Sequence, residues 1–301
     1  MVVCPAIPGD IIEKSEREGI AMGTTIIEQS VLEFKQWLVG EDRQPGTIEK
    51  YVRDIRELMD FLKDDELTNE TVSIWKAYLL SEKGLAPITI NSKLAAVGTY
   101  CRFAGIDCRV RFYKIQRKLF YEDNKNLQKD EYLRLLEAAA KAGNKRIALI
   151  IETIGATGIR VSELKYITVE TVHKGIARIH LKGKIRTIIL PGKLRSKLLK
   201  YARKRKIASG EIFITKSGKS ISRKQIWAEM KALCERANVE RSKVFPHNLR
   251  HLFAKLYYKA TRDIAKLADL LGHSTIETTR IYLLTTEYEH SRQLNNLGLV
   301  L

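Results

Sequence analysis

Apolar residues spaced three and four apart run through most of this chain, and this spacing predicts a protein built mainly from amphipathic helices. One such face comprises Ile27, Val31, Phe34 and Leu38. A longer face runs from residue 48 to 62, with Thr47 as its predicted N-cap directly after the break at Pro45-Gly46. Two further helices are expected around Trp75 and after Pro87. The stripes are interpreted as core, with no chemistry assigned to them.

The apolar spacing changes from about 3.6 to two between residues 176 and 190, which predicts a β-hairpin with Lys182-Gly183-Lys184 as its turn. Helices are expected on either side, at 130–141, 145–156, 194–206, 222–237 and 248–260. The predicted fold class is mainly α, with a helical N-terminal domain and an α-rich second domain carrying a small antiparallel β-sheet. A length of 301 residues fits two domains. We place them at 1–112 and 127–301, joined by a basic linker at 113–126.

Charge is divided unevenly along the chain, whose formal net charge is +18. Residues 1–126 hold 18 basic and 20 acidic side chains, whereas residues 127–301 hold 35 and 15. Such a surplus favours a polyanionic partner, and nucleic acid is preferred over a membrane surface because no amphipathic anchor or lipidation motif is visible. Basic and aromatic residues also mix near the linker, and the predicted DNA contacts there are Arg109, Arg111, Lys114, Arg117 and Lys118.

Several classes of protein are disfavoured. No apolar run approaches the roughly 18 residues that span a bilayer, and Met1–Pro8 lacks a basic leader, so a cytoplasmic protein is expected. The four cysteines show neither CxxC pairing nor metal-ligand spacing. With no P-loop and no acidic metal cluster in the sequence, neither a metal nor a cofactor is expected.

Four separated motifs lie in the basic half. They are Thr157-Gly158-Ile159-Arg160-Val161-Ser162-Glu163-Leu164, the hairpin lysine Lys182, Pro246-His247-Asn248-Leu249-Arg250-His251, and Leu270-Leu271-Gly272-His273 with Tyr282 nine residues after the histidine. Each motif alone is weak, but their order and spacing together are specific. The chain resembles the tyrosine recombinase (phage integrase) family, particularly Xer-like recombinases and integrases of mobile elements. The resemblance covers essentially the whole chain, because the helical first half is similar to the family's core-binding domain.

The resemblance implies a site-specific DNA recombinase that cleaves and rejoins strands through a covalent 3′-phosphotyrosine, with Tyr282 as nucleophile. Arg160 and Arg250 would stabilise the extra negative charge of the transition state, because a planar guanidinium donates two parallel hydrogen bonds to phosphate oxygens. A phenol has a pKa of about 10 and needs a proton acceptor, for which His247 is the candidate. His273 would hydrogen-bond a phosphoryl oxygen.

The leaving 5′ oxygen would be protonated by Lys182 at the hairpin tip. Lys184 is a predicted DNA contact and also the alternative general acid, since this sequence has Leu181 where the family often has a glycine. Glu163 either orients an active-site cation or is an ordinary surface acid, and the sequence does not separate the two. His251 is interpreted as structural. Asp263 is a predicted helix cap, Gly272 a helix end, and Ser274 with Glu277 a capping box ahead of the tyrosine.

By resemblance, four protomers would act on two paired double-stranded DNA sites through a Holliday junction. The apolar tail Leu297–Leu301 suggests docking of the C-terminal segment into a neighbouring protomer, with intramolecular packing as the alternative. Two rival functions stay open: a type IB topoisomerase-like enzyme that relaxes DNA without a partner site, and a catalytically idle DNA-binding regulator with the same fold.

Overall fold

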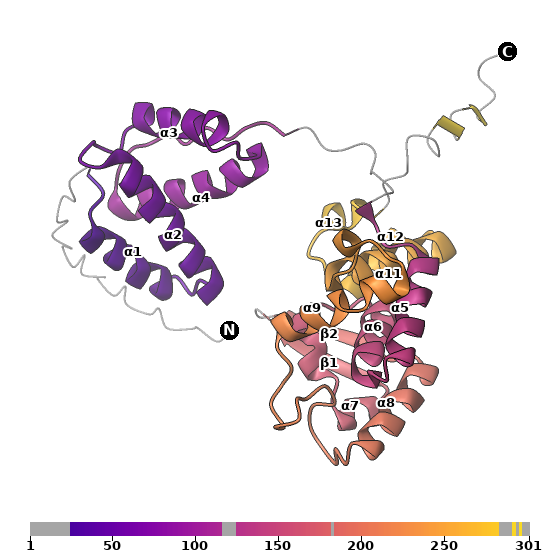
Figure 1. The fold of residues 1–301 in the computed structure, drawn as a ribbon. Helices are drawn as coiled ribbons and strands as arrows, with labels where there is room; N and C mark the ends of the chain where they lie inside the picture. Colours follow the sequence, from indigo (N-terminus) through magenta and orange to yellow (C-terminus); the bar gives the residue numbers. More distant parts are fainter. Residues whose placement is uncertain (1–24, 116–124, 182–183, 283–290, 293–294, 297–301) are drawn as a thin grey trace, which may run out of the picture. The chain divides into compact units, whose positions relative to one another are not determined.

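A computed structural model of the chain describes residues 25–115, 125–181, 184–282, 291–292 and 295–296. The described residues divide into two compact units, one before and one after the segment 116–124. Each unit has its own hydrophobic core, and Figure 1 traces the helices of both. None of the described helices is long and apolar enough to cross a membrane.

The first unit consists of four helices. They are α1 (Glu28–Gly40), α2 (Pro45–Leu62), α3 (Asn69–Ser81) and α4 (Pro87–Ala104). Trp75, Phe34 and Tyr100 are its largest fully buried side chains. The Tyr100 hydroxyl donates to Ser30 Oγ at 2.7 Å, which satisfies the one polar group that this aromatic side chain carries into the core.

Two details of the predicted helix starts are wrong. Ile27 is 55% exposed as the N-cap of α1, and its neighbour Ile26 takes the buried place. Helix α2 begins at Pro45 with Gln44 as N-cap, not after Thr47. Proline is well suited to the first helical position because it lacks only an N–H that has no intrahelical partner there.

The second unit is built from helices around one small sheet. Its elements are α5 (Lys129–Lys141), α6 (Lys145–Thr157), the 3₁₀ helix η2 (Val161–Tyr166), α7 (Val169–Lys174), β1 (Ile176–Leu181), β2 (Lys184–Ile189), α8 (Gly192–Lys204), α9 (Arg223–Lys231), α10 (Cys234–Ala237), the 3₁₀ helix η3 (Arg241–Lys243), α11 (Pro246–Thr261), α12 (Ile264–Leu271) and α13 (Ile276–Arg280). The single helix expected at 222–237 is interrupted by a turn between α9 and α10, which keeps both Met230 and Leu233 buried.

Helix α6 lies at the centre of this unit and packs against α5, α8, α9 and α11. Ile147, Ile150, Ile151 and Ile154 form one fully buried face, and Leu149 and Thr153, on another side of the helix, are buried as well. A helix with partners all round needs no polar face. The C-terminal end of α6 therefore supplies a fixed base for the loop that carries Arg160.

The sheet is a single antiparallel hairpin in which Ile176 pairs with Ile189 and Arg178 with Thr187. On β2, positions 186, 188 and 190 face inward and 187 and 189 face outward. The predicted fold class is confirmed: a mainly helical protein with one small antiparallel sheet among the described residues. The predicted hairpin tip, Lys182-Gly183, lies outside the described residues.

Candidate active site

The loop after α6 presents Arg160. Gly158 ends the helix with φ +63°, and a Cβ at this position would lie 2.4 Å from the Phe253 ring, so both the backbone conformation and the close approach require glycine. Arg160 then caps η2: its backbone N–H donates to Glu163 Oε2 at 2.7 Å, and its Nη1 donates to Oε1 at 3.1 Å. The Arg160 side chain is 40% exposed, so its remaining donors can reach a ligand.

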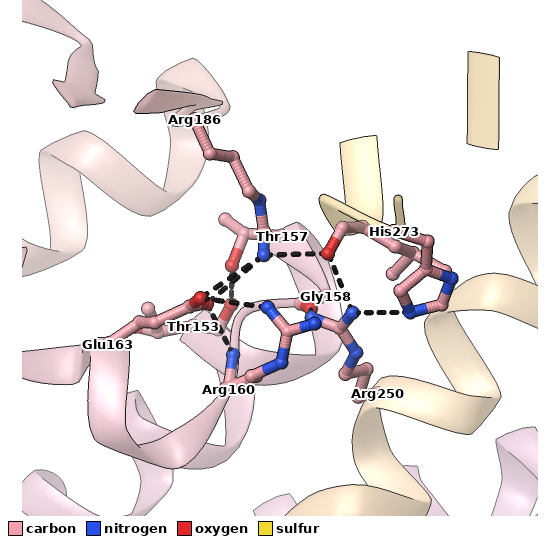
Figure 2. A network of polar contacts seen from close by, with 9 residues as sticks. Thr153, Thr157, Gly158, Arg160, Glu163, Arg186, Arg250 and His273 are labelled. Carbon is pink, nitrogen blue, oxygen red and sulfur yellow. Dashed lines mark hydrogen bonds and ion pairs between the residues drawn. The ribbon is translucent and has the colours of Figure 1, made fainter. Parts of the chain in front are cut away.

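Glu163 is buried rather than a surface acid, with 2% of the residue exposed. Its carboxylate accepts hydrogen bonds from Arg160 and also from Arg186, whose Nη1 lies 3.2 Å from Oε2. Of the two sequence-based interpretations of Glu163, the geometry therefore matches the residue that orients cations. Figure 2 shows the two arginines reaching the same carboxylate from different elements.

Arg250 is held by helix α11 and is 3% exposed. Its Nη1 donates to the Gly158 carbonyl at 2.6 Å, and its Nη2 donates to the Leu271 carbonyl at 2.7 Å. Burial and then the positive charge of Arg160 lower the pKa of Arg250, whereas Tyr282 and Glu163 oppose this effect. Backbone carbonyls on two separate segments thus fix the orientation of this guanidinium (Figure 2).

His273 follows the end of α12, where Gly272 adopts φ +64°. Its Nε2 lies 2.9 Å from Arg250 Nη2, and its Nδ1 lies 2.8 Å from Thr279 Oγ1. A guanidinium can only donate, so Nε2 accepts and the ring proton sits on Nδ1. Burial, followed by the charges of Arg250 and Arg160, lowers the pKa of His273 to about 4, so the ring is neutral at neutral pH.

Tyr282 comes just after the short helix α13 and is 5% exposed. Its ring lies nearly parallel to that of His273, with centroids 6.0 Å apart, and packs edge-to-face with the His251 ring, with centroids 4.9 Å apart. The phenol also interacts with Arg250. The fold therefore brings Tyr282, Arg250 and His273 together within one chain. Helix α13 is capped by Thr275 with no side-chain cap bond, so the predicted Ser274 start is one residue early.

His247 lies on the first turn of α11, three residues before Arg250 and hence on the same side of the helix. Its side chain is exposed. Burial of part of the ring, and then the charges of Arg250 and Arg160, lower the pKa of His247. A neutral imidazole is able to accept a proton.

Not all predicted residues can be placed. Lys182, Arg117 and Lys118 lie outside the described residues, and Lys184 is placed only as the backbone start of β2. Arg109, Arg111 and Lys114 are exposed on the first unit. The C-terminal segment expected to exchange between protomers falls mostly outside the described residues too.

The first unit also carries a concave, mainly basic site that was not predicted from the sequence, although Asp54 and Thr89 are among the residues that resemble the family's core-binding domain. A pocket of about 330 Å³ is lined by Lys50, Arg53, Asp54, Ile88, Thr89, Ser92 and Lys93. Asp54 is 1% exposed and lies at its base, 2.6 Å from Lys50 Nζ, 3.4 Å from Arg53 Nη2 and 3.6 Å from Lys93 Nζ. The pocket places three cations around one buried carboxylate, between α2 and the start of α4.

Two residues of the second unit were missed or assigned otherwise from sequence. Arg186 joins the centre described above, and His251, interpreted as structural, touches the Tyr282 ring. A signal for Arg186 was available: it shares the inward phase of β2 with Ile188 and Leu190, where an arginine is unusual. His251 carried no such signal, because its contact with Tyr282 depends on the tertiary fold.

Comparison with known proteins agrees with this geometry. A sequence model described as the phage integrase family matches residues 125–289, more than half of the chain. Over 272 residues the chain is 30% identical to the tyrosine recombinase XerA of Pyrococcus furiosus, covering 87% of this chain and 91% of XerA. It is 26% identical to XerD of Oceanobacillus iheyensis over 87% of this chain and 95% of XerD.

The fold is shared with solved recombinases. XerH bound to a palindromic difH substrate aligns with a TM-score of 0.66 at 18% identity, over 92% of this chain and 90% of XerH. Lambda integrase, solved as a tetramer on a Holliday junction, aligns with a TM-score of 0.67 at 18% identity, over 86% and 77% of the two chains. With the family model and the XerA relative both matched, the chain belongs to the phage integrase family of tyrosine recombinases.

Proposed function

We propose that this protein is a site-specific DNA recombinase in which the Tyr282 hydroxyl attacks the scissile phosphate. The attack forms a 3′-phosphotyrosine and releases a 5′ hydroxyl; the reverse step, with a strand from the partner site, rejoins the backbone. The observation that carries the proposal is that the Tyr282 ring lies nearly parallel to the ring of His273, which in turn lies 2.9 Å from Arg250 Nη2 in the same chain.

Charge stabilisation is assigned to Arg160 and Arg250. Both guanidiniums are already oriented by acceptors on the protein, so they need little reorganisation when negative charge grows on the phosphate oxygens. Removal of one such donor typically lowers a rate by about 10²–10³-fold. Arg250 is the more rigid of the two because it is nearly fully buried.

Proton transfer is assigned to His247 and Lys182, and a hydrogen bond to a phosphoryl oxygen is assigned to His273. His247 is exposed and its lowered pKa keeps it neutral, so it can accept the phenol proton. Lys182 protonates the leaving 5′ oxygen, with Lys184 as the alternative. His273 can donate to a phosphoryl oxygen only after Arg250 leaves its Nε2 and the ring changes tautomer. DNA binding would therefore exchange the Arg250–His273 contact for contacts to phosphate.

The partner is double-stranded DNA carrying a specific site, and the assembly is a tetramer on paired sites. Support comes from the basic surplus and from relatives solved on DNA: XerH on its difH substrate, and lambda integrase as a tetramer on a Holliday junction. The first unit serves as the core-binding domain, with Arg109, Arg111, Lys114 and the Asp54 pocket facing DNA phosphates. The second unit is the catalytic domain, and its C-terminal segment docks into a neighbouring protomer. The proposed location is the cytoplasm, which is compatible with a DNA partner.

A nicked suicide substrate tests the proposal. Release of the short strand beyond the nick prevents religation, so the wild-type chain should accumulate attached to a 3′ phosphate. The Tyr282→Phe variant should bind the same DNA with unchanged affinity and form no adduct. An adduct formed by the phenylalanine variant would overturn the assignment of the nucleophile.

The same preparation separates the rival functions. Relaxation of supercoiled DNA that lacks any specific site would indicate a topoisomerase-like enzyme. Binding without any adduct from the wild-type chain would indicate an idle regulator. Joining of two sites with exchange of flanking DNA is expected only of a recombinase.

A further inference from the structure

A third arginine, Arg186, lies in the centre of the candidate active site. It comes from strand β2 and is 9% exposed. Its Nη1 donates to the Leu271 carbonyl at 2.8 Å and lies 3.3 and 3.2 Å from the two carboxylate oxygens of Glu163. A single nitrogen therefore serves acceptors from η2 and from the end of α12, as Figure 2 shows.

These acceptors are the ones that orient the two arginines proposed to bind the phosphate. Glu163 Oε1 also accepts from Arg160, and the Leu271 carbonyl also accepts from Arg250. Arg186 thus shares one acceptor with each of them. If either acceptor moved, the corresponding guanidinium would move with it.

We propose that Arg186 is a positioning residue that fixes Arg160 and Arg250 relative to each other at the scissile phosphate, without touching DNA itself. This inference rests on the proposed function. It differs from a direct catalytic role because Arg186 is buried behind the acceptors that the other two guanidiniums use.

An ordinary structural ion pair does not account for Arg186. Its Nε and Nη2 are buried and have no hydrogen-bond partner among the described residues. The pKa of Arg186 is lowered to about 10, chiefly by burial; Glu163 opposes this shift, and the charges of Arg250 and Arg160 add to it. Buried donors without partners and like charges nearby both destabilise a fold. Glu163 already has Arg160 as a partner, so neutralising the carboxylate does not require a second arginine.

The backbone is also shaped around this side chain. Gly272 has φ +64°, and a Cβ built there would lie 2.4 Å from Arg186 Cδ. The segment between Leu271 and His273 therefore lies directly on the Arg186 side chain. Contact at this point links strand β2 to the segment that holds His273 as well as to the Leu271 carbonyl.

Two substitutions separate positioning from charge and from folding. Arg186→Met removes the shared donor together with the unpartnered N–H groups. Arg186→Lys keeps the charge, but its nitrogen ends short of the Nη1 position by about one C–N bond, roughly 1.3 Å. Arg178→Met is the matched control, because Arg178 is an exposed arginine on the same hairpin.

The measurement is the single-turnover rate of covalent attachment to the nicked substrate at saturating DNA, with DNA affinity and melting temperature recorded for each full-length variant. Arg186→Met should attach about 10–100-fold more slowly with unchanged DNA affinity, whereas Arg178→Met should stay within about twofold of wild type. Arg186→Lys should be intermediate at a wild-type melting temperature. If Arg186→Met does not fold, a slow but stable Arg186→Lys supports the inference.

A double-mutant comparison with Arg160 distinguishes positioning from a merely structural role, because only a positioning role makes the effects of the two substitutions on the attachment rate depend on each other. In an Arg160→Lys background, Arg186→Met should cost no more than about threefold, because residues that act as a unit are not additive. An equal loss in both backgrounds, or wild-type attachment by both Arg186 variants, would overturn the inference. Absence of any adduct from wild type and Arg178→Met alike would instead count against the proposed function.

Discussion

Each unit of the molecule contains one buried carboxylate surrounded by cations, and the two clusters differ in how the cations are held. In the first unit Asp54 pairs closely with Lys50, at 2.6 Å, and more loosely with Arg53 and Lys93, at 3.4 and 3.6 Å; the three side chains are 33%, 71% and 12% exposed. Lys93 also forms an ion pair with Glu57. Lys50 and Arg53 are thus open to water beside the pocket, whereas Lys93 is mostly covered.

In the second unit the cations are guanidiniums, and the protein holds them on several sides. Glu163 pairs with Arg160 and with Arg186, while Arg250 is fixed by the carbonyls of Gly158 and Leu271. Arg186 and Arg250 are 9% and 3% exposed. Water therefore screens Arg186 and Arg250 much less than Lys50 and Arg53, whereas Arg160, at 40% exposed, is open to solvent.

The difference matches two tasks on the same polyanion. The hydrated ammonium of an exposed, flexible lysine suits contacts that hold DNA, because it can follow the position of a phosphate. A buried planar fork, oriented in advance, suits stabilisation of charge at one phosphate during reaction. The Asp54 cluster should therefore govern affinity, and the Glu163 cluster should govern rate.

The strongest test of this division between affinity and rate is to remove one cation from each cluster. Arg250→Ala should slow covalent attachment by about 10³-fold at saturating DNA, because an oriented donor to the phosphate is lost. Lys50→Ala should change the saturated rate by less than about threefold. Single-turnover attachment measured across DNA concentrations separates the two effects. A large loss of saturated rate in Lys50→Ala would contradict the division of tasks.

Removing the charge of the carboxylates tests how far each cluster depends on them. Glu163→Gln leaves the Arg186 charge buried and should destabilise the second unit by about 3–5 kcal/mol. Asp54→Asn should cost about 1–2 kcal/mol, because Lys50 and Arg53 can turn to water. Denaturant titration gives the unfolding transitions, and proteolysis at each denaturant concentration shows which of the two units has unfolded. Equal losses of unfolding free energy in the two variants would mean that the exposure of the partner cations does not determine how much each carboxylate contributes to stability.

Acid should weaken the second unit more than the first. The pKa of His251 is lowered to about 4 by burial, His247 and Lys255, and His273 is lowered to a similar value. These histidines take up protons near pH 6.5 in the unfolded chain, but only near pH 4 in the folded unit. The free energy of unfolding is therefore at its full value above about pH 6.5 and falls as the pH is lowered towards 4.

His251→Gln should reduce the proton uptake on unfolding near pH 5 by about one proton. The free energy of unfolding measured at several pH values between 7.5 and 4.5 gives this uptake as its slope. His173→Gln, at an exposed position on α7, is the control and should keep the wild-type slope. An unchanged slope in His251→Gln would place the acid sensitivity elsewhere.

The two clusters also show what the sequence alone could predict. Arg160, Arg250 and Tyr282 were predicted because they stand in motifs that resemble those of the family, and chemistry explains why such motifs need these residue types. The helices and the hairpin follow from apolar spacing. Arg186 stands outside any motif and acquires its partners only when β2 meets η2 and α12, segments far apart in the sequence. The Asp54 pocket was missed for the same reason, since α2 and α4 must pack before Lys93 approaches Asp54.

Local signals failed where two residues competed for one position. Gln44 rather than Thr47 precedes the start of α2, because Pro45 suits the first turn. Thr275 rather than Ser274 precedes α13. In contrast, Asp263 caps α12 as predicted, with its Oδ1 accepting from the Lys266 N–H at 2.8 Å. A cap is predictable when a single candidate stands before an apolar face.

The smallest effect expected concerns how DNA affinity depends on salt. If Lys50 and Arg53 each contact one phosphate, Lys50→Gln or Arg53→Gln should lower the slope of log affinity against log salt by about 0.9. Lys35→Gln, on α1 and outside the pocket, serves as the control, and its slope should not change. Arg160→Lys keeps its charge, so it should alter the slope little while slowing attachment. A salt slope that responds to Arg160→Lys but not to the pocket variants would reverse the assignment of affinity and rate to the two clusters.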